Sequence, residues 1–116
     1  MQDGVGTHLV LELWGCTNLN SPPVVEQALK EIVTATNVTL LDLHVYPFSP
    51  IGVTGVAIVA ESHIMIHTWP ERDYAAIDVF TCGKERDLDG AIEVIREHFT
   101  PERIQMMRII RGIVVS

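Results

Sequence analysis

Apolar and more polar residues alternate over residues 7–16, and the three leucines of that stretch fall on one face of an extended chain. This alternation predicts a β-strand. The segment Asn-Ser-Pro-Pro at 20–23 then offers side-chain oxygens for a helix cap and prolines for a first turn. Beyond it, apolar residues recur at every fourth position up to Asn37, which predicts an amphipathic helix after the strand.

Further strands are indicated by segments rich in valine, isoleucine, threonine and aromatic residues, separated by proline, glycine or charged residues. These segments cover residues 38–46, 53–60, 63–68 and 74–82. Asp87 can cap a second helix, whose apolar stripe runs from Leu88 to Phe99. A closing strand is predicted over residues 103–115, with a break at Gly112.

The predicted order of elements is β-α-β-β-β-β-α-β, in a single domain that spans residues 1–116. Short connections between consecutive strands imply a mainly antiparallel sheet with two helices on one face, an α+β fold of two layers. The other face of such a sheet needs a cover that so small a chain does not supply. We therefore expect dimerisation through that face.

The composition limits the partners and the location. The longest stretch without a charged residue, 43–60, contains two prolines and two glycines, so we expect no membrane-spanning helix. A net charge of −7 without a run of basic residues argues against nucleic acid as a partner. This charge would attract a cationic small molecule. The simpler explanation of the charge is that the acidic residues keep the surface soluble. The amino terminus lacks the pattern of a secretion signal, so we expect a cytoplasmic protein whose two cysteines are thiols.

Reactive side chains concentrate in two adjacent segments, ESHIMIHTWPE and YAAIDVFTCG. A metal site of His63, His67 and Glu71 is disfavoured, because residues four apart on a strand are separated by about 13 Å. A thiol nucleophile that pairs Cys82 with His67, and a serine hydrolase built on Ser62, both lack a diagnostic sequence frame. The residues by themselves leave these options open beside purely structural roles: a turn serine, a core histidine and a small buried cysteine.

The same two segments resemble the processing and active-site region of the S-adenosylmethionine decarboxylase proenzymes, in the short bacterial and archaeal branch of that pyruvoyl-dependent family. Further stretches agree in order and spacing: GTHLVLELWGC, FSPIGVTGV and the Arg-Gly pair at 111–112. The resemblance covers nearly the whole chain, which makes it far more specific than a short motif.

The resemblance implies that the proenzyme cuts itself between Glu61 and Ser62. In this scheme the Ser62 hydroxyl attacks the preceding carbonyl, and the acyl group shifts from nitrogen to oxygen. A β-elimination then leaves a dehydroalanine, which hydrolyses to a pyruvoyl group at position 62 with loss of ammonia. Two chains result, a β chain of residues 1–61 and an α chain of residues 62–116. The active form implied by the family is a homodimer of αβ units, with sites near the subunit contact.

The resemblance also assigns processing roles to His67 and to the hydroxyl of Thr54, where the family has serine. Thr54 keeps the oxygen and adds a methyl group that restricts χ1, and we expect processing to survive. Other departures from the family pattern stand at Thr7, Tyr46 and the pair Arg72 and Asp73. They leave the implied reaction type intact and weaken the assignment of the substrate.

In the implied reaction the pyruvoyl carbonyl forms a Schiff base with the substrate amino group and accepts the electrons released with carbon dioxide, without a metal or a bound cofactor. Cys82 is the expected proton donor to the resulting carbanion. Phe48 and Trp69 match positions expected near an adenine, and Glu71 matches a carboxylate that holds ribose hydroxyls. Core packing is the competing explanation for the two aromatic residues.

The implied function is conversion of S-adenosylmethionine to S-adenosylmethioninamine and carbon dioxide for spermidine synthesis. A same-family alternative is decarboxylation of arginine or ornithine, because Asp73 beside Glu71 could pair with a guanidinium or ammonium group. A different class of function is that of an uncleaved homologue that binds a ligand or regulates a partner. The presence of Ser62, His67 and Cys82 argues against that third hypothesis.

Overall fold

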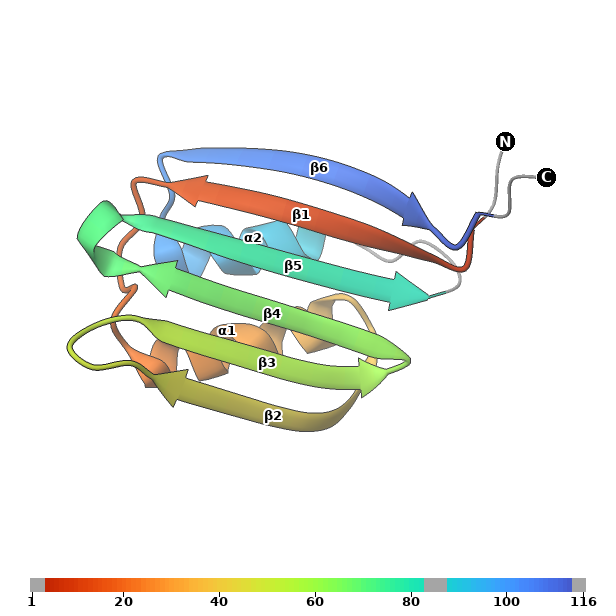
Figure 1. Ribbon diagram of the computed structural model, residues 1–116, viewed down its shortest axis with the longest axis horizontal. Helices are drawn as coiled ribbons and strands as arrows, with labels where there is room; N and C mark the ends of the chain where they lie inside the picture. Colours follow the sequence, from red (N-terminus) through yellow and green to blue (C-terminus); the bar gives the residue numbers. More distant parts are fainter. Residues whose placement is uncertain (1–3, 83–87, 114–116) are drawn as a thin grey trace.

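The computed structural model describes residues 4–82 and 88–113, which form a six-stranded antiparallel sheet with two helices on one face (Figure 1). Its elements in chain order are β1 (Gly6–Trp14), α1 (Pro22–Ala35), β2 (Thr39–Pro47), β3 (Val53–Ala60), β4 (Ser62–Trp69), the 3-10 turn η1 (Pro70–Arg72), β5 (Tyr74–Cys82), α2 (Leu88–Phe99) and β6 (Arg103–Arg111). The strands lie in the spatial order β2-β3-β4-β5-β1-β6. The predicted α+β class and order of elements are confirmed.

Most predicted boundaries agree with the structure within two residues, and two strands, β3 and β5, agree at both ends. The closing strand β6 ends at Arg111, earlier than predicted. The break predicted at Gly112 is confirmed, because that residue takes a positive φ of 78° that leaves the extended conformation. The η1 turn at Pro70 was not predicted. The predicted cap at Asp87 lies outside the described residues.

Helix α1 begins where its sequence predicts, because the Ser21 side chain accepts a hydrogen bond from the N–H of Val24 and prolines fill the first turn. Its apolar side chains pack against the sheet above Gly55 of β3. A Cβ atom at Gly55 would lie only 2.7 Å from the side chain of Leu29, so the close contact of helix and strand requires glycine there. The buried residues of this helix are Val25, Ala28, Leu29, Ile32 and Val33.

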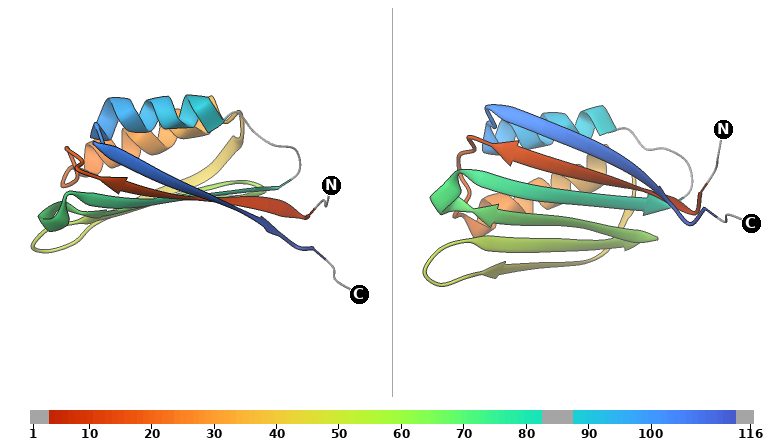
Figure 2. Two further views of the ribbon diagram at one scale, coloured as in Figure 1. Left: turned by 90° about the horizontal axis from the view of Figure 1, so that it is seen from above. Right: turned by 45° about the horizontal axis from the view of Figure 1, so that its top comes forward.

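The core lies between the helices and the sheet. Alternate residues of β1, β3, β4 and β5 are buried beneath α1 and α2, whereas the intervening residues lie on the opposite face, which we call the open face. Figure 2 shows both helices on the same side of the curved sheet. Large apolar side chains on the open face include Ile58, Met107 and Ile109, each more than 40% exposed. Within the described ranges, neither helix has the length and apolarity needed to cross a membrane.

Candidate functional site

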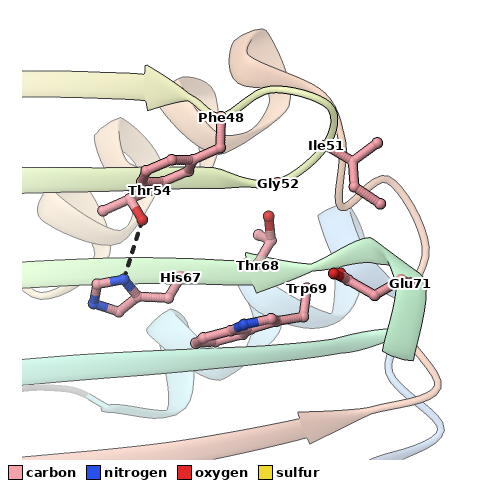
Figure 3. A pocket seen from close by; sticks show the side chains of 8 residues that line it. All are labelled: Phe48, Ile51, Gly52, Thr54, His67, Thr68, Trp69 and Glu71. Atoms are coloured by element: carbon pink, nitrogen blue, oxygen red, sulfur yellow. Dashed lines mark hydrogen bonds between the residues drawn. The ribbon is translucent and has the colours of Figure 1, made fainter.

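A cavity of about 550 Å³ opens at the end of the sheet where β3 begins and β4 ends (Figure 3). Its lining residues are Phe48, Ile51, Gly52, Thr54, His67, Thr68, Trp69 and Glu71. Among them, Phe48, Thr54, His67, Trp69 and Glu71 are predicted site residues. The structure therefore brings together the residues for which the sequence predicted ligand binding and the pair for which it predicted processing roles.

The rim and floor of the cavity are held by hydrogen bonds between separate segments. The N–H of Phe48 donates to the carbonyl of Gly52 (2.8 Å), whose positive φ of 108° suits glycine. The N–H of Gly52 in turn donates to Oδ1 of Asn20 (2.9 Å), which ties the loop to the start of α1. The buried hydroxyl of Thr68 accepts from the N–H of Val53 (2.8 Å) and donates to its carbonyl (3.2 Å). The cavity wall is thus preformed.

Thr54 and His67 are cross-strand partners on the open face, one on β3 and the other on β4. The Thr54 Oγ1 atom lies 3.2 Å from Nδ1 of His67, which is hydrogen-bonding distance. The hydroxyl donates when Nδ1 is unprotonated and accepts when Nδ1 carries the proton. His67 is only half-buried, so the alternative of a core histidine is wrong. The pair can hold the imidazole in one orientation and hold a proton at a defined atom.

Phe48 and Trp69 are exposed at 50% and 39%, so the competing explanation of core packing is wrong for both. They enter the cavity from different segments, Phe48 from the loop before β3 and Trp69 from the end of β4 (Figure 3). Glu71, on the η1 turn, also lines the cavity and is exposed. Exposed flat rings beside a carboxylate suit a ligand with an aromatic ring, hydroxyl groups and a positive charge.

Ser62 does not lie in this cavity. It is the first residue of β4 and pairs with Val59 across the hairpin turn that contains Glu61. His67 follows five residues later on the same strand, which corresponds to about 17 Å of extended chain. An odd separation also places the two residues on opposite faces of the sheet: Ser62 continues the row of Ile64 on the helix side, and His67 lies on the open face.

Cys82 is the last residue of β5 and pairs with Gly6 of β1. It lies two residues beyond Phe80, which pairs with His63 next to Ser62, so its backbone lies at the Ser62 end of the sheet. The side chain of Cys82 is outside the described part of the structure. The predicted site residues therefore form two groups at opposite ends of the sheet.

A protein-family model described as S-adenosylmethionine decarboxylase matches residues 7–112 of the chain. The chain belongs to the S-adenosylmethionine decarboxylase family. It is 52% identical over 113 residues to an S-adenosylmethionine decarboxylase proenzyme of Thermomicrobium roseum, with 97% of each chain covered. An S-adenosylmethionine decarboxylase proenzyme of Methanococcus maripaludis is 49% identical over 95% of this chain and 92% of its own.

The fold also matches a solved member of the family. The crystal structure of the adenosylmethionine decarboxylase from Aquifex aeolicus superposes with a TM-score of 0.87 at 36% sequence identity, and covers 97% of this chain and 95% of the other. The family resemblance predicted from the ESH and TCG segments is thus confirmed by the whole chain.

Two other predictions concern metal binding and the cysteine thiols. His63 and His67 both lie on β4, an extended strand, and no group of three or more metal-ligating side chains gathers within residues 4–82 and 88–113. Cys16 is a buried free thiol. Burial, with a smaller effect from Asp73, raises the pKa of Cys16 to about 11, which keeps it protonated and unreactive near neutral pH.

Several residues in or beside the cavity were not predicted from the sequence. Gly52 and Thr68 line the cavity and fix its loop, and Tyr74, beside the cavity, contacts the ring of Trp69 with a centroid distance of 5.3 Å. The signal that could have identified Tyr74 is its place opposite Trp69 across the tight Pro-Glu-Arg-Asp turn. Gly52 and Thr68 carry no comparable local signal, because the hydrogen bonds of the Gly52 N–H and the Thr68 hydroxyl join segments more than ten residues apart.

Proposed function

We propose that this chain is a self-processing, pyruvoyl-dependent decarboxylase that converts S-adenosylmethionine to S-adenosylmethioninamine and carbon dioxide, for polyamine synthesis. The observation that carries the proposal is the meeting of Phe48, Trp69 and Glu71 with the Thr54–His67 pair in one cavity. The names of the relatives, which are S-adenosylmethionine decarboxylase proenzymes, support both the substrate and the processing step.

The cavity suits the nucleoside half of this substrate. An adenine ring can stack on the exposed faces of Phe48 and Trp69, and the Glu71 carboxylate can accept two hydrogen bonds from ribose hydroxyls. The sulfonium carries a positive charge, which both the aromatic faces and the carboxylate attract. The net charge of −7 also favours approach of a cation.

The Glu61–Ser62 bond suits self-cleavage because it lies where the hairpin turn meets β4 at the end of the sheet, with Glu61 exposed and Ser62 half-buried. Val59 and the strand that follows hold Ser62 in a defined position, so a pyruvoyl group derived from it would be fixed by β4. Such a group supplies a carbonyl that accepts electrons as the substrate carboxylate leaves. We assign to Cys82, by family resemblance, the return of a proton to carbon.

Cleavage at this bond would not separate the two chains. Residues 1–61 supply β1, β2 and β3, whereas residues 62–116 supply β4, β5 and β6. Strand β1 lies between β5 and β6, and β3 pairs with β4 along six residues (Figure 1). The chains are therefore interleaved in one sheet and share one core.

A second copy of the chain would complete the site. Ser62 and His67 of one chain point to opposite faces and lie too far apart for a shared reaction, so the His67 that acts near Ser62 must come from another copy. The open face, with its exposed Ile58, Met107 and Ile109, is the surface through which we propose that two copies associate. This homodimer would place the cavity of one copy next to the Ser62 end of the other.

The substrate alternatives gain no support from the site. Asp73, on which the arginine and ornithine hypothesis rests, is exposed and does not line the cavity, whereas its neighbour Glu71 does. The relatives named above are S-adenosylmethionine decarboxylase proenzymes. The hypothesis of an uncleaved homologue is likewise without support from these names.

The test is incubation of the purified protein with S-adenosylmethionine, arginine and ornithine in parallel, with carbon dioxide release as the readout. We expect release from S-adenosylmethionine alone. Denaturing mass spectrometry on the same sample should give two fragments, residues 1–61 and 62–116, and the second of them should have a blocked amino terminus. A single uncut chain, or release only from arginine or ornithine, would contradict the proposal.

A further inference from the structure

A row of four aromatic rings crosses the open face of the sheet beside the cavity. It runs from His67 through Trp69 and Tyr74 to Trp14, with successive centroid distances of 6.2, 5.3 and 4.5 Å. The rings belong to β4, β5 and β1, whose register pairs Trp69 with Tyr74 and Tyr74 with Trp14. The row thus joins the hairpin of β4 and β5 to β1, a strand that is distant in the sequence.

The rings on either side of Trp69 are each anchored by a hydrogen bond. His67 is held through Nδ1 by the hydroxyl of Thr54, and the phenol of Tyr74 donates to the carboxylate of Glu12 on β1. Burial and the neighbouring Glu12 raise the pKa of Tyr74 to about 12, so its hydroxyl keeps the donated proton at neutral pH.

The indole of Trp69 has no such anchor. It is 39% exposed. Its side chain contacts the rings of His67 and Tyr74 and makes no hydrogen bond with any residue in the ranges 4–82 and 88–113. Its orientation therefore depends on the anchored rings of His67 and Tyr74. Because an aromatic ligand stacks well only on a ring held at a suitable angle, fixing the indole before binding lowers the entropy lost on binding.

We propose that Tyr74, held by Glu12, is a positioning residue that sets the plane of the Trp69 indole for the purine ring of the substrate. The inference rests on the proposed function, in which Trp69 binds adenine. Tyr74 itself does not line the cavity; it acts through Trp69.

The first test removes only the hydroxyl. In Tyr74→Phe the ring remains and the hydrogen bond to Glu12 is lost, so we expect KM for S-adenosylmethionine and Kd for adenosine to rise about threefold to tenfold. The kcat value and the rate of self-cleavage should stay unchanged, because neither depends on the angle of the indole. Unchanged KM and Kd, or a fall in kcat and self-cleavage in their place, would overturn the proposal.

Variants of Glu12 test the anchor from its other side. Glu12→Leu should reproduce the effect of Tyr74→Phe, whereas Glu12→Gln keeps an acceptor oxygen and should restore most of the affinity. The double variant Glu12→Leu with Tyr74→Phe should be no weaker than either single variant, since both remove the same bond. Additive losses would show that the two residues act independently and would overturn the proposal.

Tyr46→Phe is the matched control. Tyr46 is 64% exposed on the same face, its ring contacts Phe48, and its hydroxyl has no hydrogen-bond partner in the part of the chain that the structure describes. Removing that hydroxyl should leave KM and the adenosine Kd unchanged. A rise equal to that in Tyr74→Phe would mean that any lost tyrosine hydroxyl has this effect, which contradicts a specific role of Tyr74.

A spectroscopic arm needs no substrate. The chain has two tryptophans, so Trp14→Phe leaves Trp69 as the only one. On that background, Tyr74→Phe should weaken the near-ultraviolet circular dichroism of the indole, because a mobile ring loses its fixed asymmetric surroundings. An unchanged spectrum contradicts the proposal. A wild-type protein that releases no carbon dioxide contradicts the proposed function instead, while the spectrum and the adenosine Kd still decide the role of Tyr74.

Discussion

Ser62 and His67 lie on one strand, five residues apart, and face opposite sides of the sheet. The relationship follows from the two-residue period of β4, in which Ser62 shares its side with the buried Ile64 and Ile66. Extended backbone allows neither residue to approach the other within one chain. If both serve the same reaction, two copies of the chain must each contribute one of them.

This separation predicts complementation between two inactive variants. Ser62→Ala has no residue to convert and His67→Ala lacks the imidazole, so each should remain uncut alone. When the two are produced together, a mixed dimer contains one site with Ser62 from one copy and His67 from the other. We expect the His67→Ala chain to be cut in that mixture, as measured by denaturing mass spectrometry. If His67→Ala is cut efficiently when alone, or stays uncut in the mixture, the proposal that two copies of the chain share one site is contradicted.

The interleaved sheet predicts that the two fragments remain together after cleavage. Strand β1 of the first fragment is paired on both sides, with β5 and with β6 of the second. Separation would expose the buried core residues of both fragments, among them Leu9, Leu11 and Leu13. Gel filtration should therefore give a single peak that contains both fragments, and only denaturant should resolve them. Two peaks under native conditions would contradict this arrangement.

The Thr54–His67 hydrogen bond predicts a graded effect on processing. Thr54→Val keeps the shape and the branching of the side chain but removes the oxygen, so the imidazole loses its partner. Loss of one hydrogen bond of about 1 kcal/mol corresponds to a rate about fivefold lower. Thr54→Ser keeps the oxygen and should be cut at least as fast as the wild type. The measurement is the fraction cut against time in freshly synthesised protein.

A matched control separates this effect from a loss of stability. Thr34→Val, on the exposed side of α1, likewise removes a hydrogen-bonded threonine hydroxyl, one that donates to the carbonyl of Lys30 at 3.2 Å. It lies in the helix layer, away from the cavity. It should be cut at the wild-type rate. Equal slowing in both variants would assign the effect to folding and remove Thr54 from the processing site.

The buried thiol of Cys16 predicts a loss of stability in alkali. Burial raises the pKa of Cys16 from 9.0 to about 11 in the folded protein, so the unfolded chain ionises first as pH rises. The stabilisation is fully present below pH 9 and is lost as pH rises through 11. Cys16→Ala removes this pH-dependent stabilisation. The free energy of unfolding in urea should therefore fall less steeply for the variant than for the wild type between pH 9 and 11. An equal decline in both proteins would contradict the assignment.

The same residue predicts a contrast in chemical reactivity. Because Cys16 is only 6% exposed and its pKa is raised, it should react with iodoacetamide slowly in the folded protein near neutral pH. Unfolding in urea should increase its labelling rate strongly. Peptide mapping of the labelled protein follows this position separately from Cys82.

Much of this molecule was open to prediction because the relevant signals are local. The alternation of Leu9, Leu11 and Leu13 and the four-residue period of α1 need only the neighbouring residues, and both elements lie where the sequence predicts them. The family followed from the ESH and TCG segments in the same way. Even the opposite directions of Ser62 and His67 follow from the parity of one strand, once that strand is assigned.

Tertiary structure alone decided which residues meet. That Thr54 faces His67, that Phe48 and Trp69 are exposed at a cavity, and that Tyr74 reaches Glu12 all depend on register between strands. Within a hairpin the length of the turn helps to set register, but between strands such as β1 and β5 it is set by pairing across the sheet and by packing against the helices, which no short stretch of sequence encodes. Strand β1 illustrates the limit, because its neighbours β5 and β6 follow it by some sixty to a hundred residues. The amino-acid sequence thus determined the elements and the chemistry they carry, and long-range pairing determined where that chemistry is assembled.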